Sequence, residues 1–99
     1  MYRIYYTKQA MKDLENLKAA NISQKVKILV DLIRENPYQN PPRYEKLVGK
    51  LDGILSRRIN IQHRLVYQVY ETPFVENGVQ YQGKIKIIRM WSYCSLRNQ

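Results

Sequence analysis

The sequence predicts an α+β fold, with an N-terminal strand, a helical hairpin and then an antiparallel sheet of three further strands. A short run rich in aromatic and β-branched residues, Tyr2–Tyr6, opens the chain and indicates the first strand. Two stretches with apolar residues at three- and four-residue spacing follow it and indicate amphipathic helices. Alternating apolar and polar residues in the second half indicate strands with one buried face, so we expect the helices to cover that face.

The helices can be placed from their end signals. Thr7 offers a side-chain oxygen that can cap a helix beginning at the next residue. In that helix the apolar side chains form one stripe, and the charged side chains, Asp13 among them, fall elsewhere. Ser23 is expected to cap the second helix, which should end before Asn36 and Pro37.

The second half is expected to contain a hairpin and one last strand. Residues 36–46 hold three of the four prolines and should form a long, stiff loop. Strands over 54–60 and 64–71 should pair as an antiparallel hairpin. Residues 72–83 carry a proline and two glycines, which predicts an exposed loop before a strand over 84–91.

Alternation along the hairpin separates an apolar face from a polar one. The face expected to meet the core consists of Leu55, Ile59, Ile61, Leu65, Tyr67 and Val69. Ser56, Arg58 and Arg64 fall on the opposite face, which we expect to be concave, open to solvent and rich in arginine.

Length and cysteine content limit the class of protein. A chain of 99 residues buries only about 60 to 65% of its unfolded surface and cannot divide that between two cores, so we expect one domain over residues 1–99. Cys94 is the only cysteine, which excludes an internal disulfide, and His63 is the only histidine, so no metal site of cysteines and histidines is expected. No signal-peptide pattern and no apolar run of about 20 residues occurs, so we expect a cytoplasmic protein without a membrane partner.

The net charge favours a polyanionic partner. Lysine and arginine number 17 against 8 acidic residues, giving +9 and a pI near 9.8. Residues 1–42 hold seven basic and four acidic groups, whereas residues 43–99 hold ten and four. Nucleic acid or an acidic protein is therefore the expected partner, bound mainly by the second part of the chain.

The residues of that second part suit RNA cleavage by internal transfer. This reaction needs a base for the 2′-OH, cations for the charge that develops on phosphorus and an acid for the leaving 5′-oxygen, but no metal or other cofactor. Arginine suits the second role because its planar fork binds two phosphate oxygens and stays charged. Candidates for contact with RNA besides the reacting groups are Lys46, Lys50, Arg57, Arg89 and Trp91.

Four short blocks carry a resemblance to a known family. YEKL at 44–47, SRRIN at 56–60, HRLVY at 63–67 and MWSYC at 90–94 resemble, in this order, the signature blocks of the YoeB/Txe toxins of the RelE/ParE superfamily. The resemblance spans nearly the whole chain. It implies the RelE/YoeB-like microbial ribonuclease fold and a toxin of a type II toxin-antitoxin system that cleaves mRNA in the ribosomal A site.

The resemblance also implies roles and partners. Glu45 matches the family's glutamate base, and Arg58 and Arg64 match the arginines at the phosphate. An acidic, YefM-like antitoxin is implied, whose flexible tail would fold over the arginine-bearing face. Homodimers are common in that family.

The C-terminal block departs from the family pattern, because the usual histidine acid is absent and Tyr93 stands at or next to its place. A phenol with an ordinary pKa near 10 is a poorer acid at neutral pH than imidazolium, so we expect slower cleavage or a different acid. One alternative is a non-catalytic inhibitor that binds RNA or the ribosome. A ParE-like toxin of gyrase is a further alternative, against which the glutamate and arginines argue.

Overall fold

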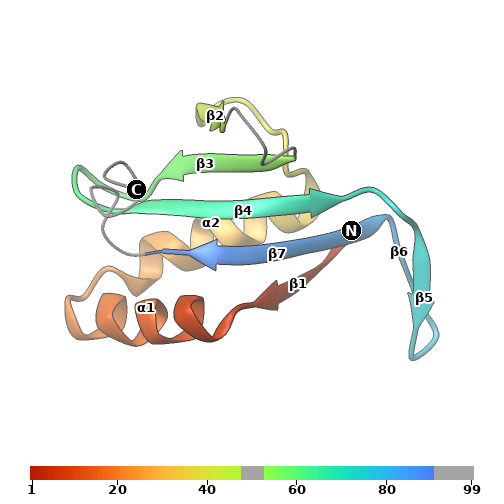
Figure 1. Ribbon diagram of the computed structural model, residues 1–99, viewed down its shortest axis with the longest axis horizontal. Coiled ribbons are helices and arrows are strands. Elements are labelled where there is room, and N and C mark those ends of the chain that lie inside the picture. Colours follow the sequence, from red (N-terminus) through yellow and green to blue (C-terminus); the bar gives the residue numbers. More distant parts are fainter. Residues whose placement is uncertain (48–52, 91–99) are drawn as a thin grey trace.

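A computed structural model describes residues 1–47 and 53–90 of the chain (Figure 1). In chain order the elements are β1 (Tyr2–Tyr6), α1 (Lys8–Ala19), α2 (Ser23–Glu35), β2 (Tyr44–Lys46), β3 (Ile54–Arg58), β4 (Arg64–Tyr70), β5 (Phe74–Glu76), β6 (Val79–Tyr81) and β7 (Gly83–Arg89). The α+β class, the N-terminal strand and the helical hairpin are confirmed.

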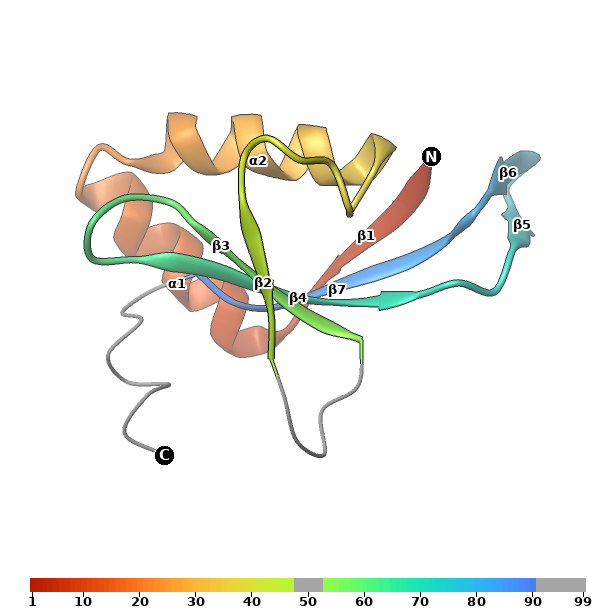
Figure 2. The ribbon, with the colours of Figure 1, turned by 90° about the horizontal axis from the view of Figure 1, so that it is seen from above.

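Five of the strands form one mixed sheet in the order β1-β7-β4-β3-β2. β1 runs parallel to β7, and the other neighbours are antiparallel. α1 and α2 run in opposite general directions, and α1 contacts β7 while α2 contacts β1 (Figure 1). β5 and β6 pair only with each other and form a small hairpin that extends beyond the end of the sheet (Figure 2).

Two segments predicted as loops contain strands. The last three residues of the predicted 36–46 loop form β2, which pairs with β3 at the edge of the sheet. The three prolines of that segment end at Pro42, so the backbone donors after it remain able to pair. In the predicted 72–83 loop, Asn77 and Gly78 both have positive φ, 51° and 79°, which is the conformation of a tight two-residue hairpin turn. The proline and glycines there mark a turn between two strands.

Two of the three predicted helix ends agree with the structure, and one differs. Thr7 caps α1, because its hydroxyl oxygen accepts a hydrogen bond of 3.0 Å from the Ala10 backbone N–H. The predicted cap at Ser23 is wrong, since Ser23 is already the first helical residue and Ile22 precedes it without a side-chain cap. α2 ends at Glu35, as the proline that follows requires.

The core lies between the helices and one face of the sheet. Its buried apolar residues are Tyr2, Ile4, Ala10, Leu17, Val26, Val30, Ile33, Leu55, Ile59, Leu65, Tyr67, Val69, Ile85, Ile87 and Met90. Ile61, expected on this face, is 94% exposed, because β3 ends at Arg58 and the following turn carries Ile61 outward. No helix within residues 1–47 and 53–90 has the length and hydropathy to cross a membrane.

Candidate active site

Neither helix packs on the second face of the sheet, which we call the helix-free face. Strand register and alternation assign side chains to it, because residues paired across neighbouring strands point to the same side. These residues are Arg3, Tyr5, Glu45, Ile54, Ser56, Arg58, Arg64, Val66, Gln68, Tyr70, Lys84 and Lys86. Glu45, Arg58 and Arg64, predicted from the sequence as the reacting groups, therefore share one face.

Glu45 and Arg64 are in direct contact. Glu45 lies on β2 and Arg64 on β4, with β3 between them, and Nη2 of Arg64 lies 3.6 Å from Oε1 of Glu45. The Arg64 side chain is 9% exposed, and the Glu45 side chain is 48% exposed. The cation is thus held within the protein while the carboxylate remains accessible to a molecule that approaches from solvent.

Ser56 holds the arginine in place. The Arg64 guanidinium donates from Nε to the Ser56 hydroxyl at 2.7 Å and from Nη2 to the Ser56 carbonyl at 3.3 Å. The prediction that this face is open to solvent is wrong for these two residues, which are 1% and 8% exposed. They lie on β3 and β4, which β2 and β7 flank on either side, whereas the prediction considered the hairpin alone.

Arg58 lies directly opposite Arg64 in the register of β3 and β4, and its side chain is exposed. Two like charges in directly opposed positions of a sheet destabilise it. The nearby Glu45 carboxylate offsets part of that repulsion, and an anionic ligand such as a phosphate would offset more. The arrangement therefore favours the binding of an anion between the two arginines.

Arg57 does not belong to this group, and its prediction as a residue that contacts RNA is corrected. It is 0% exposed and lies on the core side of the sheet, as alternation with Ser56 and Arg58 requires. Its guanidinium donates to the Tyr67 hydroxyl and to three backbone carbonyls of the segment before β2. It also lies over the Tyr44 ring, 4.9 Å from the centroid. Arg57 therefore fixes the segment that leads into β2, and with it the strand that carries Glu45.

The remaining predicted residues fall in different places. Lys46 is exposed, but its register partner is Leu55, so it points to the side opposite Glu45 and is not brought to the site. Lys50, Trp91 and Tyr93 lie outside the described residues.

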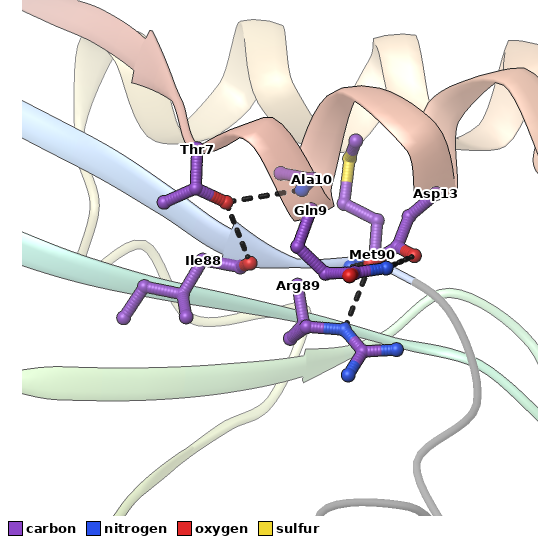
Figure 3. A network of polar contacts seen from close by, with 7 residues as sticks. All are labelled: Thr7, Gln9, Ala10, Asp13, Ile88, Arg89 and Met90. Carbon is purple, nitrogen blue, oxygen red and sulfur yellow. Dashed lines mark hydrogen bonds and ion pairs between the residues drawn. The ribbon is translucent and has the colours of Figure 1, made fainter.

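Arg89 has a partner that the sequence did not indicate (Figure 3). Its Nε donates to Asp13 Oδ2 at 3.0 Å, and the same oxygen accepts the Met90 backbone N–H at 3.0 Å. The Gln9 amide donates to the other oxygen at 3.0 Å. The helical pattern placed Asp13 away from the buried stripe, but the residue is 1% exposed. Its burial is compensated by the hydrogen bonds that it accepts from the donors at the end of β7. It ties α1 to the strand end, and a role of Arg89 in RNA binding stays a prediction.

His63 belongs to the turn between β3 and β4. Its carbonyl accepts from the Ile59 N–H at 2.9 Å, and its N–H donates to the Asn60 side chain at 2.8 Å. The residue is 3% exposed, and burial lowers the pKa of its ring below the usual value. His63 is thus a connection residue directly before Arg64. Within residues 1–47 and 53–90, no three histidine, cysteine or acidic side chains gather as metal ligands would.

Comparison with known proteins decides the family. The family model described as the YoeB-like toxin of bacterial type II toxin-antitoxin systems matches residues 6–82. This chain is a member of that YoeB-like family. A toxin YoeB of Synechocystis sp. (strain ATCC 27184 / PCC 6803 / Kazusa) is 37% identical over 46 residues, which are 46% of this chain and 54% of the relative. The matched part thus spans about half of that YoeB.

Solved structures of YoeB proteins share the fold over nearly all of their length. The YoeB/ParE toxin from Agrobacterium tumefaciens superposes with a TM-score of 0.75 at 22% identity, covering 92% of this chain and 98% of that one. YoeB in the YoeB-YefM complex from Staphylococcus aureus gives 0.68 at 29% identity, with 94% and 98% covered. The YoeB dimer from Staphylococcus aureus gives 0.71 at 28% identity, with 93% and 97% covered. The expected YoeB-like fold is confirmed.

Proposed function

We propose that this YoeB-like protein is the toxin of a type II toxin-antitoxin system and that it cleaves mRNA on the ribosome without a metal. The observation that supports this most is the contact of 3.6 Å between Arg64 and Glu45, with Arg58 directly opposite Arg64. A carboxylate and two guanidinium groups on one face are the base and the phosphate-binding cations that RNA cleavage needs.

The reaction begins at a phosphodiester held between Arg58 and Arg64. Glu45 takes the proton of the 2′-OH, and the 2′-oxygen forms a bond to the adjacent phosphorus. The bond between phosphorus and the 5′-oxygen breaks, leaving a 2′,3′-cyclic phosphate on one product. The arginines stabilise the charge on the phosphoryl oxygens, which is greatest in the transition state, and Ser56 keeps Arg64 in place while it does so.

Protonation of the leaving 5′-oxygen is assigned to Tyr93. A phenol holds its proton firmly at neutral pH, so we expect cleavage to be slower than with an imidazolium acid at the same place. If no group delivers this proton, the protein acts instead as a translation inhibitor that binds RNA or the ribosome without cutting.

The partner that silences the toxin would be an acidic antitoxin. One related structure is a YoeB-YefM complex, and the present chain carries a net charge of +9. An acidic segment laid over the helix-free face would pair with Arg58 and Arg64 and block the phosphate site. Homodimerisation is a second expected assembly, since a related structure is a YoeB dimer. Both assemblies would form in the cytoplasm, where the ribosome is found.

The test is primer extension on mRNA from a purified translating extract with the full chain added. Cleavage in the A-site codon should require ribosomes and fall by at least about 100-fold in Arg64→Ala and Glu45→Gln. Arg34→Ala is the matched control, because Arg34 lies partly exposed on α2. This variant should cleave mRNA as the wild type does. Undiminished cleavage in Arg64→Ala would refute the proposal.

The alternatives give other results in the same preparation. A non-catalytic inhibitor would stop translation without new RNA ends, and Tyr93→His would then create them. A toxin of gyrase would leave mRNA intact and inhibit supercoiling of plasmid DNA.

A further inference from the structure

A second cluster of aromatic and basic residues lies on the helix-free face, at the end away from Arg64. Tyr70, Thr72, Phe74 and Lys84 line a pocket there with a volume of about 410 Å³. Tyr70 pairs with Lys84 in the register of β4 and β7, so both side chains point away from the core. The pocket falls within the range of roughly 300 to 1,000 Å³ that is usual for small-ligand sites.

The rings of the pocket are held in place by their neighbours. Phe74 stacks on Tyr81 with the centroids 5.2 Å apart, and Nζ of Lys84 lies 5.3 Å from the Phe74 centroid and 5.7 Å from that of Tyr5. The Tyr70 hydroxyl donates to Gln68 at 2.9 Å, while the residue as a whole remains 41% exposed. These contacts leave aromatic surface next to a cation and accessible from solvent.

The charges around the pocket select an anion. None of its described lining residues is acidic. Glu76, on the same hairpin as Phe74, is already engaged by Arg3 at 3.0 Å. Lys84 forms no ion pair with any acidic residue in the described part of the chain, and Lys86 is exposed two residues along the same strand. A ligand with a negative group and a flat ring fits this combination, as a nucleotide does.

The pocket and the candidate active site lie in line on one strand. Tyr70 and Arg64 stand at the two ends of β4, six residues apart, which is a span of about 20 Å along a strand. The row between them on β4 contains Val66 and Gln68, neither of them charged. An extended RNA strand bound at Arg64 can therefore follow the sheet to the pocket, a few nucleotides away.

We propose that this pocket is a second site for single-stranded RNA, in which a base stacks on Tyr70 or Phe74 and a phosphate contacts Lys84. The proposal rests on RNA being the ligand of the Arg64 end, as the proposed function has it. The site would hold the strand without taking part in cleavage.

Binding can be measured apart from cleavage, by fluorescence anisotropy of a labelled single-stranded RNA whose 2′-hydroxyl groups are methylated, so that it cannot be cut. With the full chain, Tyr70→Leu and Lys84→Glu should each lower the affinity roughly tenfold, whereas Tyr70→Phe should bind as the wild type does. Tyr38→Leu and Lys12→Glu are matched controls. Tyr38 is also 41% exposed, Lys12 is an exposed lysine of α1, and both should stay within about twofold of the wild type.

The outcomes separate this site from the nuclease proposal. Wild-type affinity in both Tyr70→Leu and Lys84→Glu, or equal losses in the controls, would overturn the second site. So would a change of oligomeric state in light scattering with unchanged RNA affinity, because the pocket would then be a protein contact. If the wild type does not cleave mRNA but Lys84→Glu binds RNA more weakly than the wild type, only the nuclease proposal is refuted. If Tyr70→Leu does not fold, Lys84→Glu and a photo-crosslink from thiouridine to Tyr70 give the same decision.

Discussion

Replacing Arg57 by methionine should destabilise the protein by about 3 to 5 kcal/mol. The guanidinium makes four hydrogen bonds of 2.5 to 3.0 Å while it is 0% exposed. Hydrogen bonds from a charged donor contribute about 1.5 to 3 kcal/mol each, which gives a gross loss of roughly 6 to 12 kcal/mol. Part of this is offset, because the variant no longer buries a charge, and that burial costs several kcal/mol. The remainder is a large share of a total stability of about 5 to 15 kcal/mol.

The assay is urea unfolding of the full chain followed by far-UV circular dichroism. A loss of this size lowers the midpoint by roughly 2 M if the slope is about 2 kcal/mol per molar urea. Arg58→Met is the matched control, since Arg58 is the next residue but lies exposed on the other face, and it should change stability by no more than about 0.5 kcal/mol. The reasoning is refuted if Arg57→Met stays within about 1 kcal/mol of the wild type, or if the two variants lose the same amount.

Three further predictions concern buried groups. Asp13→Ala should cost about 3 kcal/mol because it leaves Arg89 and a backbone donor unpaired, and Asp13→Asn should cost less because one acceptor oxygen remains; urea unfolding of both variants checks the order. Burial lowers the pKa of His63, so the unfolded chain binds this proton at a higher pH than the folded chain. The contribution of His63 to the free energy of unfolding should be complete above about pH 6.5 and decline as the pH falls through the folded pKa. In His63→Gln, the free energy of unfolding from urea curves should therefore depend less on pH between about pH 7 and 5. Gly83→Ala would place a methyl carbon 2.1 Å from the Tyr70 carbonyl oxygen, so its melting temperature should fall by about 10 °C or more; an unchanged value would show that the strands can separate there without cost.

Local signals in the sequence were sufficient for much of the fold. The aromatic run of β1, the cap at Thr7 and the proline after α2 each act over a few residues, and each placed an element correctly. β2 could not be found this way, because three residues after a proline-rich segment carry no pattern of their own and become a strand only by pairing with β3. The predicted cap at Ser23 was wrong because a residue type that favours the cap position is also tolerated inside the first turn.

The candidate site divides in the same way. Alternation was enough to bring Arg58 and Arg64 to one face, and the structure adds the contact of Arg64 with Glu45. Alternation also puts Arg57 on the core side, but its charge suggested a surface role. Its burial depends on carbonyl groups from residues 37, 39 and 42, which are distant in the sequence and supply the compensation that a buried guanidinium requires. Asp13 is a parallel case, because two of its partners, Arg89 and the Met90 backbone, lie 76 and 77 residues away.

The parallel pairing of β1 with β7 links the first residues of the chain to almost the last described ones. Such a contact closes a long loop that runs from Tyr2 to Gly83, so it forms late and only after β7 has been synthesised. A nascent chain that stops before Gly83 leaves β1 without its partner and leaves β4, the strand of Arg64, at an unpaired edge. Translation that is interrupted before β7 therefore yields fragments that lack the completed sheet, and a cell that makes this protein meets the arginine site within that sheet only after β7 has been synthesised.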